Sequence, residues 1–169
     1  MRPIIAKLLA APVLIGAACV LAGLFGALHN QVSYTVGPTY FTEFKFLQFR
    51  TSQESWGRLA VSTIGWRASW WMGLVLGPLL LIPTLFGREV SRIGRLFLTG
   101  ATVVFAAAAL GSLSGWACAT VTDMEPFSRA GWMHNGAYGG AVAGALIAFG
   151  LLCGLVIGGP DCLGGPAGS

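Results

Sequence analysis

Apolar residues gather into four long runs along the chain, and most polar positions fall between these runs. A membrane-spanning helix needs about 20 predominantly apolar residues. The runs therefore predict four spanning helices, at about residues 4–28, 68–86, 96–120 and 135–157. The expected fold class is an all-α integral membrane protein, a four-transmembrane-helix bundle that forms a single membrane domain over residues 1–169.

The first apolar run also has features of a secretory signal peptide. Arg2 and Lys7 supply the positive charge that precedes the apolar part of such a peptide. The run is long for that part, however, and no A-x-A cleavage pattern precedes His29. We therefore expect an uncleaved first span, with cleavage as the alternative.

The segment at residues 29–67, between the first two spans, is polar and rich in aromatic residues. Pro38 is typical of a helix start, and four apolar side chains then share one helical face: Tyr40, Phe41, Phe44 and Leu47. The alternation at residues 44–46 indicates a short strand as the alternative. Residues 52–67 predict a second amphipathic helix that runs into the second span. We expect the segment to lie on the membrane surface with its apolar face down. The tail at residues 158–169, rich in Gly and Pro, is expected to be disordered.

Composition strengthens the membrane prediction. The chain is 55% hydrophobic with a mean hydropathy of +0.74, and only 9% of its residues are charged. A soluble fold of this size needs more polar surface than that. The net charge of +4 comes from basic residues near the span ends. This position indicates that the charge sets the membrane topology and contacts lipid headgroups, and does not indicate nucleic-acid binding. The four cysteines form no CxxC pair and are interpreted as small apolar side chains.

Charge and aromatic residues together predict the orientation. The basic turn between the second and third spans favours the cytoplasm, and its determinants are Arg88, Arg92 and Arg95. Basic residues in the segment at 29–67 weaken this argument. All six tryptophans, and the three tyrosines with them, fall near one membrane face, as expected of rings that favour the headgroup zone. We expect both termini in the cytoplasm and the aromatic segment outside.

Small residues recur four positions apart in the spans, for example at Gly73 and Gly77, and at Gly136, Gly140 and Gly144. This spacing lets helix backbones approach closely. Packing within one bundle is the favoured interpretation. A homo-oligomer or a partner membrane protein is the alternative.

Two histidines are the leading candidates for chemistry. His29 and His134 are each followed by asparagine, and both are expected at the outer membrane face. With Asp123 and Glu125 on the same side, they could bind a metal or haem. The alternative is that each histidine caps a helix end or anchors at the interface. The cofactor is unknown from the sequence.

Signatures of other functions do not occur in the sequence. It holds no P-loop, no GxSxG and no HExxH, and no ionisable residue is expected deep in a span. We therefore do not expect an enzyme or a proton-coupled transporter. Threonines and serines inside the spans, such as Thr99, Thr102 and Ser112, are expected to bond their own helix backbone.

Residues 29–49, HNQVSYTVGPTYFTEFKFLQF, resemble a signature of small bacterial multi-pass membrane proteins of unassigned function, roughly SYTxxPxYFTxFKFxQF. The stretches Met133-His134-Asn135 with Tyr138-Gly139-Gly140, and Trp70-Trp71-Met72-Gly73, resemble two further elements of that family. Together they cover about a third of the chain. Ser and Glu of the family pattern are replaced by Gly37 and Thr39, which removes a helix N-cap and its acidic follower.

The resemblance implies a bacterial inner-membrane protein and no particular reaction. Its motif residues map to the outer face in the predicted topology, and with Trp71 they are the candidate interface or site: His29, Tyr34, Tyr40, Phe44, Trp70, His134, Asn135 and Tyr138. We expect an accessory subunit or an oligomeric scaffold that acts through this face. The alternative is a metal, haem or lipid binding or permeation protein, with a site near His29 and His134.

Overall fold

The computed structural model describes residues 2–86 and 90–157, and all regular secondary structure in this part of the chain is helical. Three single helices are long and apolar enough to cross a membrane, and a bent pair of helices passes the same test as one broken span. The all-helical prediction is confirmed, and three of the four predicted spans are single long helices. The second predicted span, at 68–86, reaches spanning length only together with the helix before it. Arg88 and the tail at 158–169 lie outside the described residues.

The first helix is longer than the predicted span. α1 extends from Arg2 to Val36, so the predicted loop residues 29–36 continue the helix. The reason is that their polar side chains find partners in the fold. Asn30 is 5% exposed and Ser33 is fully buried, and both are hydrogen-bonded to backbone carbonyls. A helix can therefore continue through sequence that resembles a surface loop.

A compact turn follows α1. Residues Pro38–Tyr40 form α2, a π-helical turn η1 spans Phe41–Lys45, and Phe46–Gln48 form α3. The strand alternative for residues 44–46 is wrong, since these residues are helical. A Cβ atom on Gly37 would meet the carbonyl of Pro126 and approach the Cβ of Ala130 to 2.9 Å. Close approach to the last helix is thus the structural reason for glycine at this corner.

The predicted helix at residues 52–67 begins later than expected. Gln53–Ser55 form a single 3₁₀ turn, η2, and α4 runs from Arg58 to Ser69. α4 does not run straight into the second span, because α5, Met72–Leu85, is bent from it by 46°. Both halves stay against α1, since Gly65 packs on the backbone of Gly26 and Gly73 packs on the backbone of Cys19. The bend lets one broken helix follow α1 on both sides of the break.

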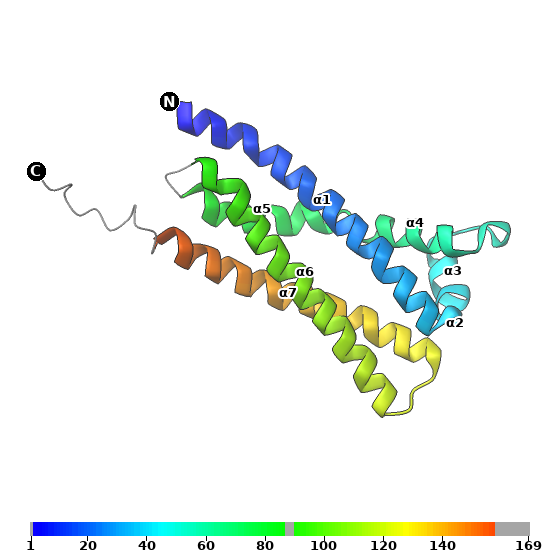
Figure 1. The fold of residues 1–169 in the computed structure, drawn as a ribbon. Coiled ribbons are helices and arrows are strands. Elements are labelled where there is room, and N and C mark those ends of the chain that lie inside the picture. Colours follow the sequence, from blue (N-terminus) through cyan, green and yellow to red (C-terminus); the bar gives the residue numbers. More distant parts are fainter. Residues whose placement is uncertain (1, 87–89, 158–169) are drawn as a thin grey trace, which may run out of the picture.

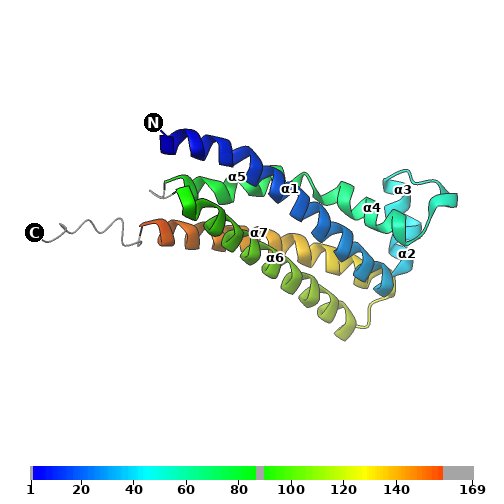
Figure 2. The same cartoon turned by 45° about the horizontal axis from the view of Figure 1, so that its top comes forward.

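The last two helices form a closely packed antiparallel pair (Figures 1 and 2). α6 spans Val90–Val121 and α7 spans Pro126–Ile157. A Cβ atom on Gly136 would meet the carbonyl of Gly111, and one on Gly140 would meet that of Ala107. The small residues of this pair are therefore engaged inside the bundle, as the favoured interpretation predicted. Gly150 and Gly154 face open space instead.

Two separate clusters of buried apolar residues result. The aromatic cluster comprises Tyr40, Phe41, Phe46, Val61, Ile64 and Ala130. The apolar core comprises Ala18, Leu80, Leu81, Ile93, Phe97, Ala101, Val104, Ala145, Ala148 and Leu152. The start of α1 and the end of α7 lie at one end of the bundle, and α2 and α3 lie at the other (Figures 1 and 2). We call the latter end, with the aromatic cluster, the aromatic end.

Candidate functional site

The two histidines meet inside the aromatic end. His29 comes from α1 and His134 from α7, and their ring centroids are 4.8 Å apart in an edge-to-face arrangement. The sequence predicted that both residues lie at one membrane face, but it did not predict that they are in contact. The structure brings them into direct contact.

His29 is held by three helices. Its Nε2 lies 2.9 Å from the hydroxyl of Ser112 on α6, so the third long helix contributes to the site. Its ring stacks on Phe25 with a centroid distance of 5.9 Å, and Phe25 in turn packs against Phe105 at 5.5 Å. Packing and hydrogen bonding together therefore fix the ring.

His134 is held by hydrogen-bonding groups at both ring nitrogens. Its Nδ1 lies 2.8 Å from the carbonyl oxygen of Ala130, and its Nε2 lies 3.2 Å from Oδ1 of Asn30. The amide nitrogen of Asn30 donates to the carbonyl of Val61 at 3.0 Å. This chain of contacts joins α7, α1 and α4, and it sets the orientation of the Asn30 amide.

The three contacts cannot all be hydrogen bonds while His134 is neutral. Backbone carbonyls only accept, so Nδ1 must donate to Ala130 and the Asn30 amide nitrogen must donate to Val61. A neutral ring then presents a lone pair at Nε2 to the acceptor oxygen of Asn30. With a proton on both nitrogens of His134, all three contacts are satisfied. Burial and the nearby Lys45 ammonium both disfavour that second proton, so in the neutral ring the Nε2 lone pair faces the Asn30 oxygen without a hydrogen bond between them.

Lys45 is the third component. It ends the π-helical turn, is only 8% exposed, and its ammonium lies 5.7 Å and 5.4 Å from the ring centroids of Tyr40 and Phe44. Among the described residues no carboxylate pairs with it. Burial lowers the pKa of Lys45, because the charged form is poorly solvated. Its charge also acts on both histidines. π-helical turns are frequent at functional sites.

Tyr40 covers the histidines from the side of α2. It is 8% exposed, and its ring centroid lies 5.0 Å from that of His134. Burial and the neighbouring Tyr138 raise the pKa of Tyr40 to about 12. The phenol therefore keeps its proton at neutral pH and can donate a hydrogen bond.

A small cavity of about 30 Å³ lies among these groups. Its polar lining includes His29, Asn30, Lys45, Ser69 and His134. A second cavity of about 60 Å³ adjoins it and has an almost wholly apolar lining, with Leu76, Val104 and Phe105 among its residues. The two share four lining residues: Phe25, Ser69, Ala137 and Tyr138. A polar compartment thus continues into an apolar one.

The two acidic residues predicted as metal ligands do not join the histidines. The side chain of Asp123 is 99% exposed and its carboxylate accepts a hydrogen bond from Arg129 at 3.3 Å, while Glu125 is exposed immediately before α7. The described residues contain no group of three or more His, Cys, Asp or Glu side chains that could hold a metal ion. Two of the four predicted ligands are therefore together and two are not.

The other predicted site residues divide between the cavity and the surface. Tyr138 lines both cavities, and Tyr34 packs edge-to-face on Phe41 at 5.3 Å. The remaining four are exposed: Phe44, Trp70, Trp71 and Asn135. Arg92 and Arg95 lie in the first turns of α6, as expected for residues near a span end, and line a separate surface hollow.

Sequence reasoning missed Asn30, Lys45 and Ser112 as site residues. Asn30 was visible as the neighbour of His29, and a repeated His-Asn pair could have flagged it. Lys45 resembles an exposed residue in an alternating run, and only the π-helical turn directs it inward. Ser112 resembled the backbone-bonded threonines. Thr99 and Thr102 do bond their own helix, at 3.0 and 2.9 Å, whereas Ser112 bonds His29.

These features define a class, an all-helical candidate multi-pass membrane protein with a buried polar site at one end. Its long helices expose many large apolar side chains, including Leu8, Leu28 and Leu146 at 67–69%, as helices in contact with lipid do. No family model matches the chain, and neither a curated protein nor a solved structure matches it.

Proposed function

We propose that this protein binds an amphipathic carboxylate, a fatty-acid-like lipid, with its headgroup in the cavity between Lys45, His29 and His134. The observation that carries the proposal is a largely buried lysine that lines the same cavity as two imidazoles, with no carboxylate against its ammonium among the described residues. A charge on a largely buried side chain without an oppositely charged partner is poorly solvated. A bound anion would supply that partner.

The hydrogen-bond network supports an anion as well. Without a negative group beside it, burial disfavours a second proton on His134, and its Nε2 then makes no hydrogen bond to Asn30. A positive ring beside the Lys45 ammonium is unfavourable unless a negative group lies near both. A carboxylate between them would stabilise the doubly protonated ring and complete the network. Tyr40, protonated at neutral pH, is a further donor at the edge of the site.

The size of the cavity favours a compact headgroup. About 30 Å³ accommodates on the order of one or two water molecules, which suits a carboxylate better than a bulky headgroup. The adjoining cavity by Leu76, Val104 and Phe105 would receive the first methylenes of an alkyl chain. Tyr138, at the junction of the two cavities, is 47% exposed. The remainder of the ligand's alkyl chain would leave the cavity beside Tyr138 and extend into the lipid.

The same residues fit a metal or haem less well. Both nitrogens of His134 and the Nε2 of His29 already have hydrogen-bond partners, and no third ligand stands beside them in the described part of the chain. A macrocycle is also far larger than a cavity of 30 Å³. Of the three ligand classes suggested by the sequence, the lipid is the one these residues favour. The proposed function is binding and involves no chemical step.

The proposal extends to location. We infer a bacterial inner-membrane protein with both termini in the cytoplasm and the aromatic end outside, which rests on the basic residues at the start of α6 and on the resemblance of residues 29–49. The hypothesis that the protein is an accessory subunit or a scaffold is less favoured. Its small-residue surfaces on α6 and α7 are largely engaged within the bundle, which leaves the exposed tryptophans at residues 70 and 71 as its support.

The test compares two probes that differ only in the headgroup. Oleic acid and oleyl alcohol are offered to the solubilised full-length protein, and binding is measured by native mass spectrometry. We expect oleate to bind more strongly than the alcohol. The preference should fall about tenfold or more in Lys45→Gln, because a charge-assisted hydrogen bond is lost. Arg95→Gln, with the same change in net charge at the other end of the bundle, should keep it.

The outcome also distinguishes the alternatives. Equal binding of acid and alcohol, or an unchanged preference in Lys45→Gln, would overturn the carboxylate proposal. Co-purification of a second polypeptide whose loss follows substitution of Trp70 and Trp71 would support the accessory reading instead. A bound metal that is lost in His29→Ala/His134→Ala would favour the metal site.

A further inference from the structure

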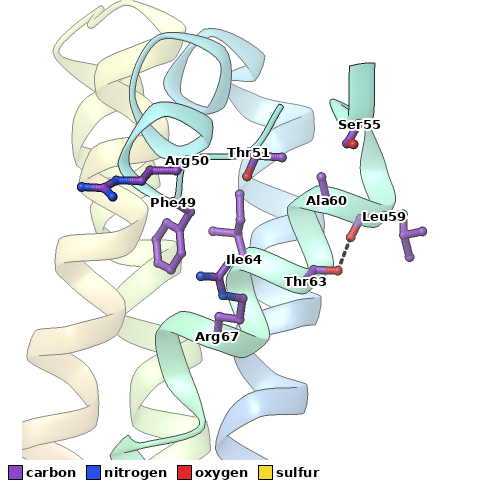
Figure 3. A pocket seen from close by; sticks show the side chains of 9 residues that line it. All are labelled: Phe49, Arg50, Thr51, Ser55, Leu59, Ala60, Thr63, Ile64 and Arg67. Atoms are coloured by element: carbon purple, nitrogen blue, oxygen red, sulfur yellow. Dashed lines mark hydrogen bonds between the residues drawn. The ribbon is translucent and has the colours of Figure 1, made fainter. Parts of the chain in front are cut away.

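A second and larger hollow lies on the outside of the aromatic end. It has a volume of about 290 Å³ and runs between the loop after α3 and the first half of α4 (Figure 3). Its lining residues are Phe49, Arg50, Thr51, Ser55, Leu59, Ala60, Thr63, Ile64 and Arg67. Only Ile64 is shared with the histidine cavity. We call this hollow the arginine groove.

The arginine groove is positively charged. Arg50 and Arg67 are among its lining residues, and no acidic residue is. Figure 3 shows Arg67 next to Phe49, the Arg50 side chain extending outward from the same side, and Ser55 and Leu59 on the opposite side. The Arg67 guanidinium lies 5.4 Å from the centroid of the Phe49 ring. A guanidinium that stacks on an aromatic ring keeps its N–H donors free at the edge for a phosphate.

The rest of the lining combines hydroxyl groups with an apolar wall. Thr51, Ser55 and Thr63 supply the hydroxyls, and the Thr63 hydroxyl donates to the carbonyl of Leu59 at 2.9 Å. Leu59 is 83% exposed at the rim. An exposed leucine beside two arginines matches a ligand that has an anionic head and an apolar body.

The backbone at Arg50 points to a role for its side chain. Arg50 has φ 52°, in the left-handed region, and it ends α3 where the amide of Thr51 bonds the carbonyl of Phe46 at 2.9 Å. Glycine is the usual residue at such a helix end, because it adopts this conformation without strain. The other non-glycine residue with positive φ in the described chain is Asp123, a type that tolerates it better. Strain of this kind is typical of functional sites.

We propose that the arginine groove binds the phosphate of an anionic glycerophospholipid. The Arg67 guanidinium would hold the phosphate oxygens and the Arg50 side chain would turn inward to join it, while the glycerol and the start of an acyl chain would lie along Leu59. The membrane is the source that the position favours. α4 is the first half of the broken span, and the same helix exposes Trp66 and is followed by the exposed Trp70. This site is independent of the carboxylate proposed for the histidine cavity.

The experiment places the full-length protein in two kinds of lipid nanodisc. One contains phosphatidylcholine alone and the other also contains phosphatidylglycerol. Amide hydrogen exchange of residues 50–67 is compared between them. We expect slower exchange with phosphatidylglycerol, and we expect Arg50→Gln/Arg67→Gln to abolish the difference. Each arginine should change the apparent affinity for the lipid about tenfold or more, as charge-assisted hydrogen bonds do.

Two further variants separate binding from folding and from net charge. Arg50→Gly relieves the left-handed backbone, so it should keep or raise the melting temperature while it weakens the lipid-dependent protection. Arg92→Gln/Arg95→Gln removes the same charge at the other end of the bundle and should leave protection of residues 50–67 unchanged.

Three results would overturn the proposal. The first is equal exchange in the two nanodiscs, and the second is a lipid effect that survives in Arg50→Gln/Arg67→Gln. The third is protection of residues 50–67 by inorganic phosphate alone in detergent, since this would show that a soluble anion is sufficient and that the lipid is not what the groove recognises.

Discussion

The aromatic cluster and the apolar core lie in one small bundle but are built differently. The apolar core is filled by aliphatic side chains and Phe97. Of the buried polar residues in the described chain, only Thr84 lies near this core, and its hydroxyl donates to the carbonyl of Leu81 in its own helix at 2.7 Å. Beside the aromatic cluster lie the other buried polar residues of the described chain: Asn30, Ser33, Lys45, Ser112 and His134.

The difference shows which region carries specific chemistry. Polar groups in a membrane domain are expensive to bury, and those that remain are usually functional. Near the apolar core, the buried hydroxyl of Thr84 makes its hydrogen bond within its own helix. In the aromatic end, Asn30, Ser112 and His134 bond across helices, and Lys45 has no carboxylate beside it in the described chain. Stability should therefore depend most on the first region and binding on the second.

Truncation in the apolar core should have the largest effect on stability. Phe97 is completely buried, and we expect Phe97→Ala to cost about 3–5 kcal/mol because it leaves a cavity. The melting temperature in detergent measures this loss. The oleate preference of the molecules that remain folded should be unchanged. A loss of that preference at a temperature where the variant is folded would show that the two regions are not separable.

The contact between α6 and α7 joins the two regions, and a glycine substitution tests it. A Cβ atom on Gly136 would meet the carbonyl of Gly111, so Gly136→Ala must separate the helices and should cost about 1–3 kcal/mol. Gly139 lies on the same helix with nothing within 4 Å of such an atom. Gly139→Ala is the matched control and should be neutral or slightly stabilising, because alanine favours helix. Similar melting temperatures for the two variants would contradict the packing.

Within the aromatic end, the asparagine neighbours of the two histidines form another matched pair. Asn30 is 5% exposed and links His134 to Val61, whereas Asn135 is exposed. Asn30→Ala removes the hydrogen bond that joins α1 to the Val61 carbonyl of α4 and leaves the Nε2 of His134 without a polar neighbour, and should cost about 1–3 kcal/mol. It should also weaken oleate binding. Asn135→Ala should change neither quantity. Equal behaviour of the two variants would argue against the network.

The pattern of apolar runs was sufficient to predict the long helices, because an apolar run of spanning length has few alternatives. It failed where polar residues are buried by tertiary contacts. Residues 29–36 resemble a loop, yet Asn30 and Ser33 have partners that let α1 continue. The bend between α4 and α5 was also missed, since no proline or glycine marks residues 70 and 71.

The candidate site was only partly predictable for the same reason. The two histidines were selected by their rarity and by the predicted topology, but contact between α1 and α7 is a property of the packed bundle. Lys45 was not selected, because its inward direction depends on the π-helical turn that precedes α3. Asp123 and Glu125 were selected because the predicted topology places them on the same membrane side as the histidines, and the turn directs them to solvent.

The smallest predicted effect concerns pH, which should change stability and ligand affinity in opposite directions. Burial lowers the pKa of Lys45 from its ordinary value of 10.5, so the unfolded chain binds its proton more tightly than the native protein does. Between the lowered pKa and 10.5, stability therefore rises with pH. The melting temperature of the wild type relative to Lys45→Met should increase from neutral pH toward pH 10. Tyr40 has its pKa raised to about 12 and begins to oppose this trend only above its ordinary value of 10.0.

Ligand binding should follow the opposite slope. As Lys45 loses its proton, the site loses the charge that would hold a carboxylate, so oleate affinity should fall over the same pH range in which stability rises. In Lys45→Met, the pH dependence of stability and that of oleate affinity should both become weaker. In Phe97→Ala both pH dependences should remain, although the variant is less stable at every pH. If affinity and stability instead rise together with pH, the ammonium does not hold the ligand. The contribution of the aromatic end to binding would then have to come from the histidines alone.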